Sequence, residues 1–384
     1  MPRPPLATEA VRAMSGAVYS SLAGRLAEFK GEKYPLHVGD TWVKPILGAR
    51  MEDLSVVEYP GMHRYQAVQG IPELVEAIAE RVASRTGLAV SRDEVLVTAG
   101  ATGGLAAWAA AFVAPGEEVL VLSPSWPLFA GSVRIVHGTP VHVPFVDLGA
   151  DAADELVTRL SAAVTARTVA VYFSSPNNPS GRVFPESWLR AIAGFARERD
   201  LWVVADEVYE DFVFAGQHVP MRPFAMERTI TAYSLSKSFG MAGNRCGYLV
   251  GPVEVLVEVR KVGTHFYYHA PTAAQIAAVK VLSGAGESWV ASVSRSYTLV
   301  AEHAAARLGV SMPEGGTFLF LDVTASLDEH GLEGFLQRCV SRGVLVAPGP
   351  QFGPHPHHVR VCFTCERPEV VLRGIDVLAS IMGR

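Results

Sequence analysis

A single lysine, Lys237, stands among serines and glycines in the stretch from Ser234 to Gly247, directly after an apolar segment that we expect to be a strand. A lysine amine that is partly desolvated and close to other cations has a lowered pKa and can act as a nucleophile. The hydroxyl groups of Ser234 and Ser236 and the guanidinium of Arg245 are suitable donors for a phosphate dianion. Taken alone, the same spacing also fits a solvated lysine in a turn of small residues.

Three other segments follow expected strands and carry polar groups. Asn178 lies in a proline-rich loop and can donate from its amide to a ligand. Asp206 ends an apolar run, where it is desolvated unless it meets a cation, and Tyr209 follows three residues later. The backbone N–H groups of Ala101 and Thr102 open a helix and can bind an anion. Each segment also has an ordinary interpretation. The loop at Asn178 fits a plain turn, and Asp206 fits the N-cap of a helix. The glycine-rich segment at Ala101 and Thr102 is a weak motif.

The elements that must position these groups alternate between strand and helix from residue 95 to residue 262. We expect strands at 95–97, 118–122, 141–143, 169–173, 201–205, 229–233 and 246–250. This alternation predicts an α/β fold with a mainly parallel, seven-stranded sheet and helices on both faces. Ligands bind outside the carboxyl ends of such strands, so the four segments should converge on one crevice.

The two ends of the chain predict a second, smaller α+β domain. Helical periodicity covers residues 9–30, and a long helix is expected over 273–307, followed by strands that include 345–347. We therefore predict a large domain, and a small domain with an N-terminal arm, comprising residues 46–290 and residues 1–45 plus 291–384.

A lysine nucleophile, a buried acid and phosphate donors in one crevice meet the needs of pyridoxal 5′-phosphate. From about Leu36 to its end, the chain resembles the class I/II aminotransferases, fold type I enzymes of the aspartate aminotransferase superfamily that use this cofactor. The resemblance rests on the segments around Lys237, Asn178, Asp206 and Arg360 in combination.

The resemblance implies a role for each candidate residue around the cofactor ring. Lys237 forms the Schiff base, Asp206 pairs with the ring nitrogen, and Tyr209 and Asn178 bond the ring oxygen. Trp126 stacks on the ring. By the same resemblance, the phosphate is held by Ser234, Ser236, Arg245 and the backbone of Ala101 and Thr102.

Three further residues are assigned from the resemblance. Tyr65 reaches the phosphate of the cofactor in a neighbouring subunit, which implies a homodimer with shared active sites. Arg360 clamps the substrate carboxylate in a bidentate fork, with Asn178 beside it, and the segment at Gly39 closes over that carboxylate.

The implied activity is transfer of an amino group between an L-amino acid and a 2-oxo acid, with the freed Lys237 amine moving the proton at the α-carbon. Elimination, cyclisation or oxidation with the same cofactor is the alternative. No second arginine for a dicarboxylate side chain is apparent, and the stretch 264–269 is aromatic. That stretch favours either an apolar or aromatic substrate side chain or packing at a subunit interface.

Composition excludes several other classes of protein. The 384 residues carry 33 basic and 38 acidic side chains, a net charge of −5, which argues against a nucleic-acid binder. The sequence lacks the GxGxxG motif of dinucleotide-binding dehydrogenases and the long extension of a helix-turn-helix regulator. Apolar runs are shorter than the ~20 residues of a membrane span, no signal peptide is apparent, and four scattered cysteines predict no disulfide framework. We expect a cytoplasmic protein without a metal.

Charged residues make up only 18% of the chain, against a typical ~25%. A large apolar subunit interface would account for this low fraction, because obligate interfaces are apolar.

Overall fold

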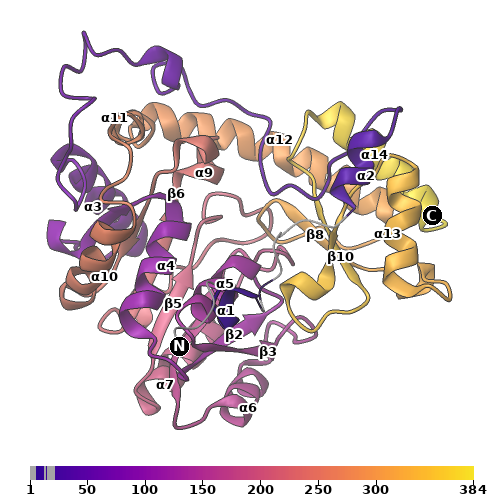
Figure 1. Ribbon diagram of the computed structural model, residues 1–384, viewed down its shortest axis with the longest axis horizontal. Coiled ribbons are helices and arrows are strands. Elements are labelled where there is room, and N and C mark those ends of the chain that lie inside the picture. The colour runs from indigo at the N-terminus through magenta and orange to yellow at the C-terminus, as the bar shows by residue number, and fades with distance from the viewer. Residues whose placement is uncertain (1–5, 13, 15–21) are drawn as a thin grey trace.

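The computed structural model describes residues 6–12, 14 and 22–384 (Figure 1). Its strands are β1 (Val95–Thr98), β2 (Glu118–Ser123), β3 (Thr139–Pro144), β4 (Thr168–Ser174), β5 (Trp202–Asp206), β6 (Thr229–Ser234), β7 (Gly247–Val250), β8 (Phe318–Asp322), β9 (Ala347–Pro348) and β10 (His358–Cys362). Its longer helices are α3 (Pro72–Thr86), α4 (Gly100–Phe112), α5 (Pro127–Ile135), α6 (Ala153–Ala163), α7 (Glu186–Glu198), α10 (Val253–Phe266), α11 (Thr272–Val281), α12 (Gly284–Leu308), α13 (Gly331–Ser341) and α14 (Pro368–Ile381). Short helical segments are α1 (Glu9–Arg12), α2 (Ala23–Glu28), α8 (Arg222–Ala225) and α9 (Leu235–Ser238).

Seven strands form one sheet in the order β1-β7-β6-β5-β4-β2-β3. β7 runs antiparallel to both of its neighbours, and the pairs from β6 to β3 are parallel. The sheet confirms the predicted fold class, and the seven strands expected for it from the sequence all appear within two residues of their predicted bounds.

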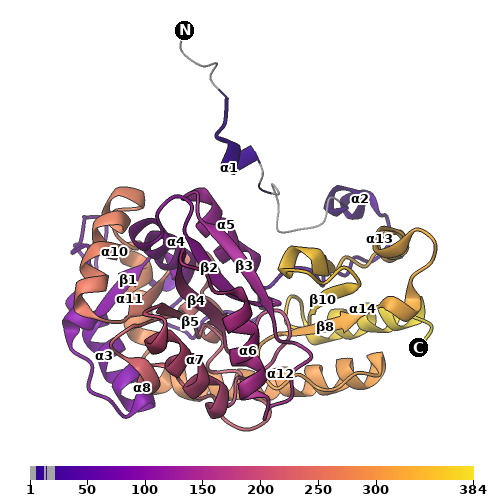
Figure 2. The same cartoon turned by 90° about the horizontal axis from the view of Figure 1, so that it is seen from below.

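Alternate residues of the central strands pack into two separate cores, one on each face of the sheet. Val171 and Phe173 lie with α6 and α7, whereas Ala170 and Tyr172 lie with α4, α5 and α10 (Figure 2). Both faces are therefore buried, which explains why the strands read as nearly continuous apolar runs.

A second sheet of three antiparallel strands, in the order β8-β10-β9, lies beside the large sheet with α13 and α14 (Figure 1). The long helix α12 extends from the region of α11 towards this small sheet and contacts α14. The predicted smaller α+β unit is present, and the domain boundaries stay a prediction.

Two predicted elements are wrong. The helix expected over 273–307 is two helices, because Ser283 adopts an extended conformation (φ −79°, ψ 169°) between α11 and α12. A Cβ on Gly286 would meet the Val281 carbonyl oxygen at 1.7 Å, so the close passage of the two helices depends on this glycine.

The strand expected at 345–347 begins only at Ala347, and Val344 instead forms an isolated bridge with Tyr34. Of the helix expected over 9–30, α1 and α2 are present, and residues 13 and 15–21 lie outside the described residues.

Candidate active site

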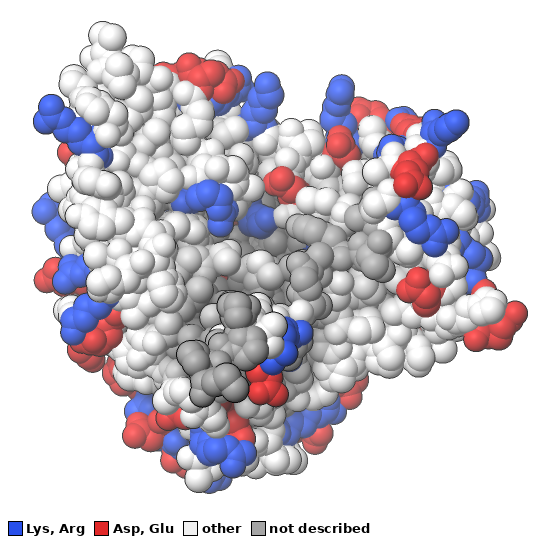
Figure 3. Space-filling model, in the orientation of Figure 1, with Lys and Arg blue, Asp and Glu red and all other residues white. Residues whose placement is uncertain are grey.

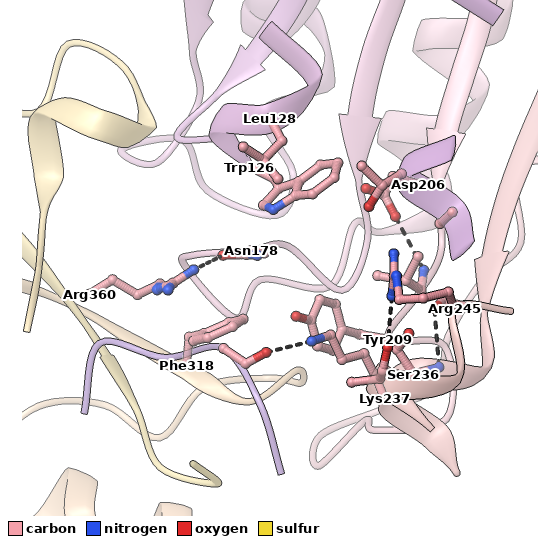
Figure 4. A pocket seen from close by; sticks show the side chains of 16 residues that line it. Trp126, Leu128, Asn178, Asp206, Tyr209, Ser236, Lys237, Arg245, Phe318 and Arg360 are labelled. Carbon is pink, nitrogen blue, oxygen red and sulfur yellow. Dashed lines mark hydrogen bonds between the residues drawn. The ribbon is translucent and has the colours of Figure 1, made fainter. Parts of the chain in front are cut away.

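Groups from both sheets surround one pocket at the carboxyl ends of β4, β5 and β6 (Figure 4). Twelve of the thirteen candidate residues line it: Gly39, Ala101, Thr102, Trp126, Asn178, Asp206, Tyr209, Ser234, Ser236, Lys237, Arg245 and Arg360. The segments converge because parallel strands present their carboxyl ends at one edge of the sheet, as the sequence predicts.

Lys237 lies on the single turn α9, which follows β6 directly. Its Nζ donates to the carbonyl oxygen of Gly39 at 2.5 Å, so the N-terminal segment passes within reach of the amine. Burial lowers the pKa of Lys237, and the nearby Asp40 partly opposes that shift. A lowered pKa makes the neutral amine more available as a nucleophile or base.

Asp206 ends β5 and is 4% exposed. Its Oδ2 accepts a hydrogen bond from the Tyr172 hydroxyl at 2.8 Å, and its Oδ1 accepts a longer one, 3.4 Å, from the Val208 backbone. Burial raises the pKa of Asp206 to about 6, against the lowering effect of Tyr172. Within the described part of the chain, Asp206 takes part in no ion pair. The N-cap interpretation is wrong, because turns rather than a helix follow Asp206.

Another group of pocket residues could hold an anion. The Ser234 hydroxyl caps α9 by accepting from the Ser236 backbone at 3.1 Å, and Arg245 donates to the Ala242 carbonyl at 2.8 Å. Gly100, at φ +71°, opens helix α4, and a Cβ there would lie 2.6 Å from Arg245 Nη2. The start of α4 and the guanidinium are therefore as close as a glycine allows, and together with the two hydroxyls that line the same pocket they form a donor set that fits a phosphate dianion.

Arg360 enters the pocket from β10 of the small sheet and is 3% exposed. Its Nη1 donates to Asn178 Oδ1 at 3.0 Å and its Nη2 to the His37 carbonyl at 2.7 Å. The guanidinium carbon lies 4.3 Å from the ring centroid of Phe318 and 4.8 Å from that of Phe352. These contacts fix the plane of the fork that would receive a carboxylate.

Tyr65 does not reach this pocket. Its side chain is 82% exposed, and its ring centroid lies 4.9 Å from that of Tyr268. This position is the one expected of a residue that serves another subunit, and that role stays a prediction.

The sequence reasoning missed four residues that line the pocket, namely Leu128, Val208, Ala242 and Phe318. Leu128 and Val208 each lie two residues after a candidate, Trp126 and Asp206. Phe318 begins β8 of the small sheet, and nothing in the sequence places it against Arg360.

The comparisons with known proteins agree with this geometry. The sequence profile of the family Aminotransferase class I and II matches residues 38–378 of the chain. The chain belongs to this family. The aspartate/prephenate aminotransferase of Thermus thermophilus is 32% identical over 331 residues, covering 84% of each chain. The arginine–pyruvate transaminase of Pseudomonas aeruginosa is 33% identical, covering 83% of this chain and 81% of its own.

Solved structures of aminotransferases share the fold over nearly the whole length. Aspartate aminotransferase from Thermus thermophilus with maleate superimposes with a TM-score of 0.88 at 28% identity, covering 98% of this chain and 99% of its own. N-Succinyldiaminopimelate aminotransferase from Mycobacterium tuberculosis gives the same TM-score and identity and covers 98% and 100%. The protein is therefore a transaminase, which moves an amino group between an amino acid and a 2-oxo acid, on the fold predicted from the sequence.

Proposed function

We propose that this aminotransferase binds pyridoxal 5′-phosphate in the pocket of Figure 4. The observation that carries the proposal is that Lys237 and Asp206 line one pocket together with the anion cradle at Arg245 and the fork of Arg360. The buried carboxylate of Asp206 forms no ion pair in the described part of the chain, so a protonated ring nitrogen would give it a direct cationic partner. The cradle would take the phosphate.

The cofactor, when bound, supplies an aldehyde that captures the amino group and a ring that draws electrons from the α-carbon. Lys237 Nζ would be the base that moves the proton of that carbon, and burial lowers the pKa of this amine, which favours its neutral form. Asp206 would hold the proton at the ring nitrogen. Tyr209 and Asn178 would donate hydrogen bonds to the ring oxygen, and Trp126 would pack against the ring.

We propose that the substrate side chain is uncharged and mainly apolar. The lysine and arginine side chains that line the pocket are Lys237, Arg245 and Arg360, and each of them already has a role. The remaining wall includes Leu128 and Phe318. A second carboxylate would lose its hydration there without gaining a cation from the described residues, which is costly.

A scan of half-reactions tests both proposals. The holoenzyme is mixed with single amino acids, and conversion of the cofactor is followed by its visible absorption. We expect rapid conversion with amino acids that have aliphatic or aromatic side chains and slow conversion with aspartate or glutamate. Failure to bind the cofactor would refute the first proposal, and faster conversion with aspartate would refute the second. Release of ammonia without conversion of the cofactor would indicate elimination instead.

We also propose that the active enzyme is a homodimer. Apolar side chains are exposed in the loop before α3 and at the end of α10, namely Val56, Val57, Tyr65, Phe266 and Tyr268. The face in Figure 3 carries few charges over this region, and most of its charges lie towards the edges. Such a surface suits an apolar interface between two copies of the chain, with Tyr65 of each copy completing the site of the other.

Subunit complementation tests the shared site. Tyr65→Ala and Lys237→Ala should each be poorly active, and a mixture refolded together should regain activity because a mixed dimer contains one site without either substitution. Absence of any gain, or a fully active monomer in sedimentation, would overturn the proposal.

A cytoplasmic location completes the proposal. The four cysteines are free, as expected of a protein in a reducing compartment. The described residues contain no helix that is both long and apolar enough to span a bilayer. Cell fractionation tests the location, and recovery of the protein in an oxidising compartment would contradict it.

A further inference from the structure

A buried tyrosine that does not line the pocket lies behind its acid. Tyr172 is fully buried in the middle of β4, and its hydroxyl donates to Asp206 Oδ2 at 2.8 Å. β4 and β5 are parallel neighbours in which Tyr172 pairs with Val204 and Ser174 pairs with Asp206. Since side chains alternate along a strand, Tyr172 and Asp206 are on the same face of the sheet, two positions apart on adjacent strands.

The ring of Tyr172 is itself held in place. Phe129 stacks on it with ring centroids 3.8 Å apart and an angle of 10° between the planes. Phe129 lies on α5, the helix that begins directly after Trp126. The start of α5 therefore links the ring that faces the pocket, on the residue before the helix, to the ring that fixes Tyr172, on its first turn.

We infer that Tyr172, clamped by Phe129, is a positioning residue that orients the Asp206 carboxylate towards the ring nitrogen of the bound cofactor. The Tyr172 hydroxyl donates to Oδ2, whereas Oδ1, among the described residues, accepts only the 3.4 Å hydrogen bond from the Val208 backbone and keeps acceptor capacity. A carboxylate held at one oxygen by a rigid donor loses its freedom to rotate, so the other oxygen is presented in one direction.

The bond also favours the ionised carboxylate. Burial of Asp206 and the negative charge of Glu207 favour its protonated form, while the Tyr172 hydroxyl, the Val208 backbone and the positive charge of Lys237 favour the ionised form. Removal of the hydroxyl should therefore leave a carboxyl group that is both less ordered and more often protonated.

The test compares two ligands in two variants, and it rests on the proposed cofactor. Tyr172→Phe keeps the ring and its stacking on Phe129 and removes only the hydroxyl. Tyr248→Phe is the matched control, because Tyr248 is also buried, in β7 of the same sheet, but does not line the pocket. Affinity of each apoenzyme is measured for pyridoxal 5′-phosphate and for its 1-deaza analogue, in which carbon replaces the ring nitrogen.

We expect Tyr172→Phe to weaken the binding of pyridoxal phosphate about tenfold, because the variant loses a hydrogen bond to the charged Asp206 carboxylate. Binding of the 1-deaza analogue should stay unchanged, because it has no ring nitrogen for Asp206 to bind. Tyr248→Phe should change neither affinity. Isotope-edited infrared spectra of the apoenzyme should show that the Asp206 carboxyl in Tyr172→Phe stays protonated to higher pH than in the wild type. Equal losses for both ligands would mean that Tyr172 acts only on the fold, and no loss for either would exclude the role altogether. If the wild type binds neither ligand, the proposed cofactor fails instead.

Discussion

Arg360 Nη1 donates to Asn178 Oδ1 at 3.0 Å across the boundary between the two sheets. Arg360 belongs to β10 of the small sheet, and Asn178 follows β4 of the large sheet. The proposed carboxylate fork and the proposed cofactor loop are therefore joined by a direct bond between buried side chains. A substrate carboxylate that binds Arg360 would therefore bind a guanidinium whose position already depends on the loop that carries Asn178.

Replacement of Arg360 by lysine should raise KM more than it lowers kcat. One ammonium cannot serve both Asn178 and the His37 carbonyl while also receiving a carboxylate in two parallel bonds. We expect KM for the amino donor to rise about tenfold or more, the value of one charge-assisted hydrogen bond. Steady-state kinetics measure this, with Arg367→Lys as the control outside the pocket. An unchanged KM would remove Arg360 from the substrate site.

Replacement of Lys237 by alanine should abolish turnover while the fold persists. Loss of a positioned base lowers rates by about 10²–10⁴-fold, and loss of the nucleophile adds to this. The thermal unfolding curve of the apoenzyme should stay close to that of the wild type. Lys261→Ala, on the exposed side of α10 in an ion pair with Glu258, is the control. Retained activity in Lys237→Ala would contradict the assignment.

Replacement of Gly100 by alanine should weaken binding of the cofactor and of inorganic phosphate. The residue is at φ +71°, and a Cβ would lie 2.6 Å from Arg245 Nη2, so the backbone is strained and the guanidinium must move. The left-handed conformation alone costs about 1–2 kcal/mol, and we expect about tenfold weaker binding. Gly243→Ala is the matched control, because no atom lies within 4 Å of a Cβ there. Equilibrium dialysis decides the matter, and equal affinities for the two variants would contradict the cradle.

Stability of the apoenzyme should fall between pH 7 and pH 5, in part because of His37. Burial, and after it the positive charge of Arg360, lowers the pKa of His37 from 6.5 to about 4. As the pH falls below 6.5 the unfolded chain takes up this proton first, so unfolding is favoured progressively down to the folded-state pKa. We expect His37→Gln to lose about 1–2 kcal/mol less than the wild type over this interval.

Urea unfolding at pH 7 and pH 5 measures this difference. His303→Gln, on the exposed side of α12, is the control and should follow the wild type. Identical losses in His37→Gln and the wild type would show that His37 does not contribute.

The sequence by itself determined the order of strands and helices along the chain, the fold class and nine residues of the pocket, and the family resemblance added Gly39, Trp126 and Arg360. It could do so because apolar runs and glycine or proline punctuation are local features, and because parallel strands present their carboxyl ends together. Lys237, Asn178 and Asp206 each follow such a run directly, so their convergence follows from the topology alone.

Only the tertiary structure decided which other side chains contact and orient the residues of the site. In the sequence, Tyr172 is indistinguishable from the other residues of a buried strand. Its hydrogen bond to Asp206 depends on the register of β4 against β5. Phe318 meets Arg360 only because the small sheet packs against the large one. The break between α11 and α12 likewise reflects packing, since the local pattern favours a continuous helix. These contacts join residues far apart in the chain, and local propensity carries no information about them.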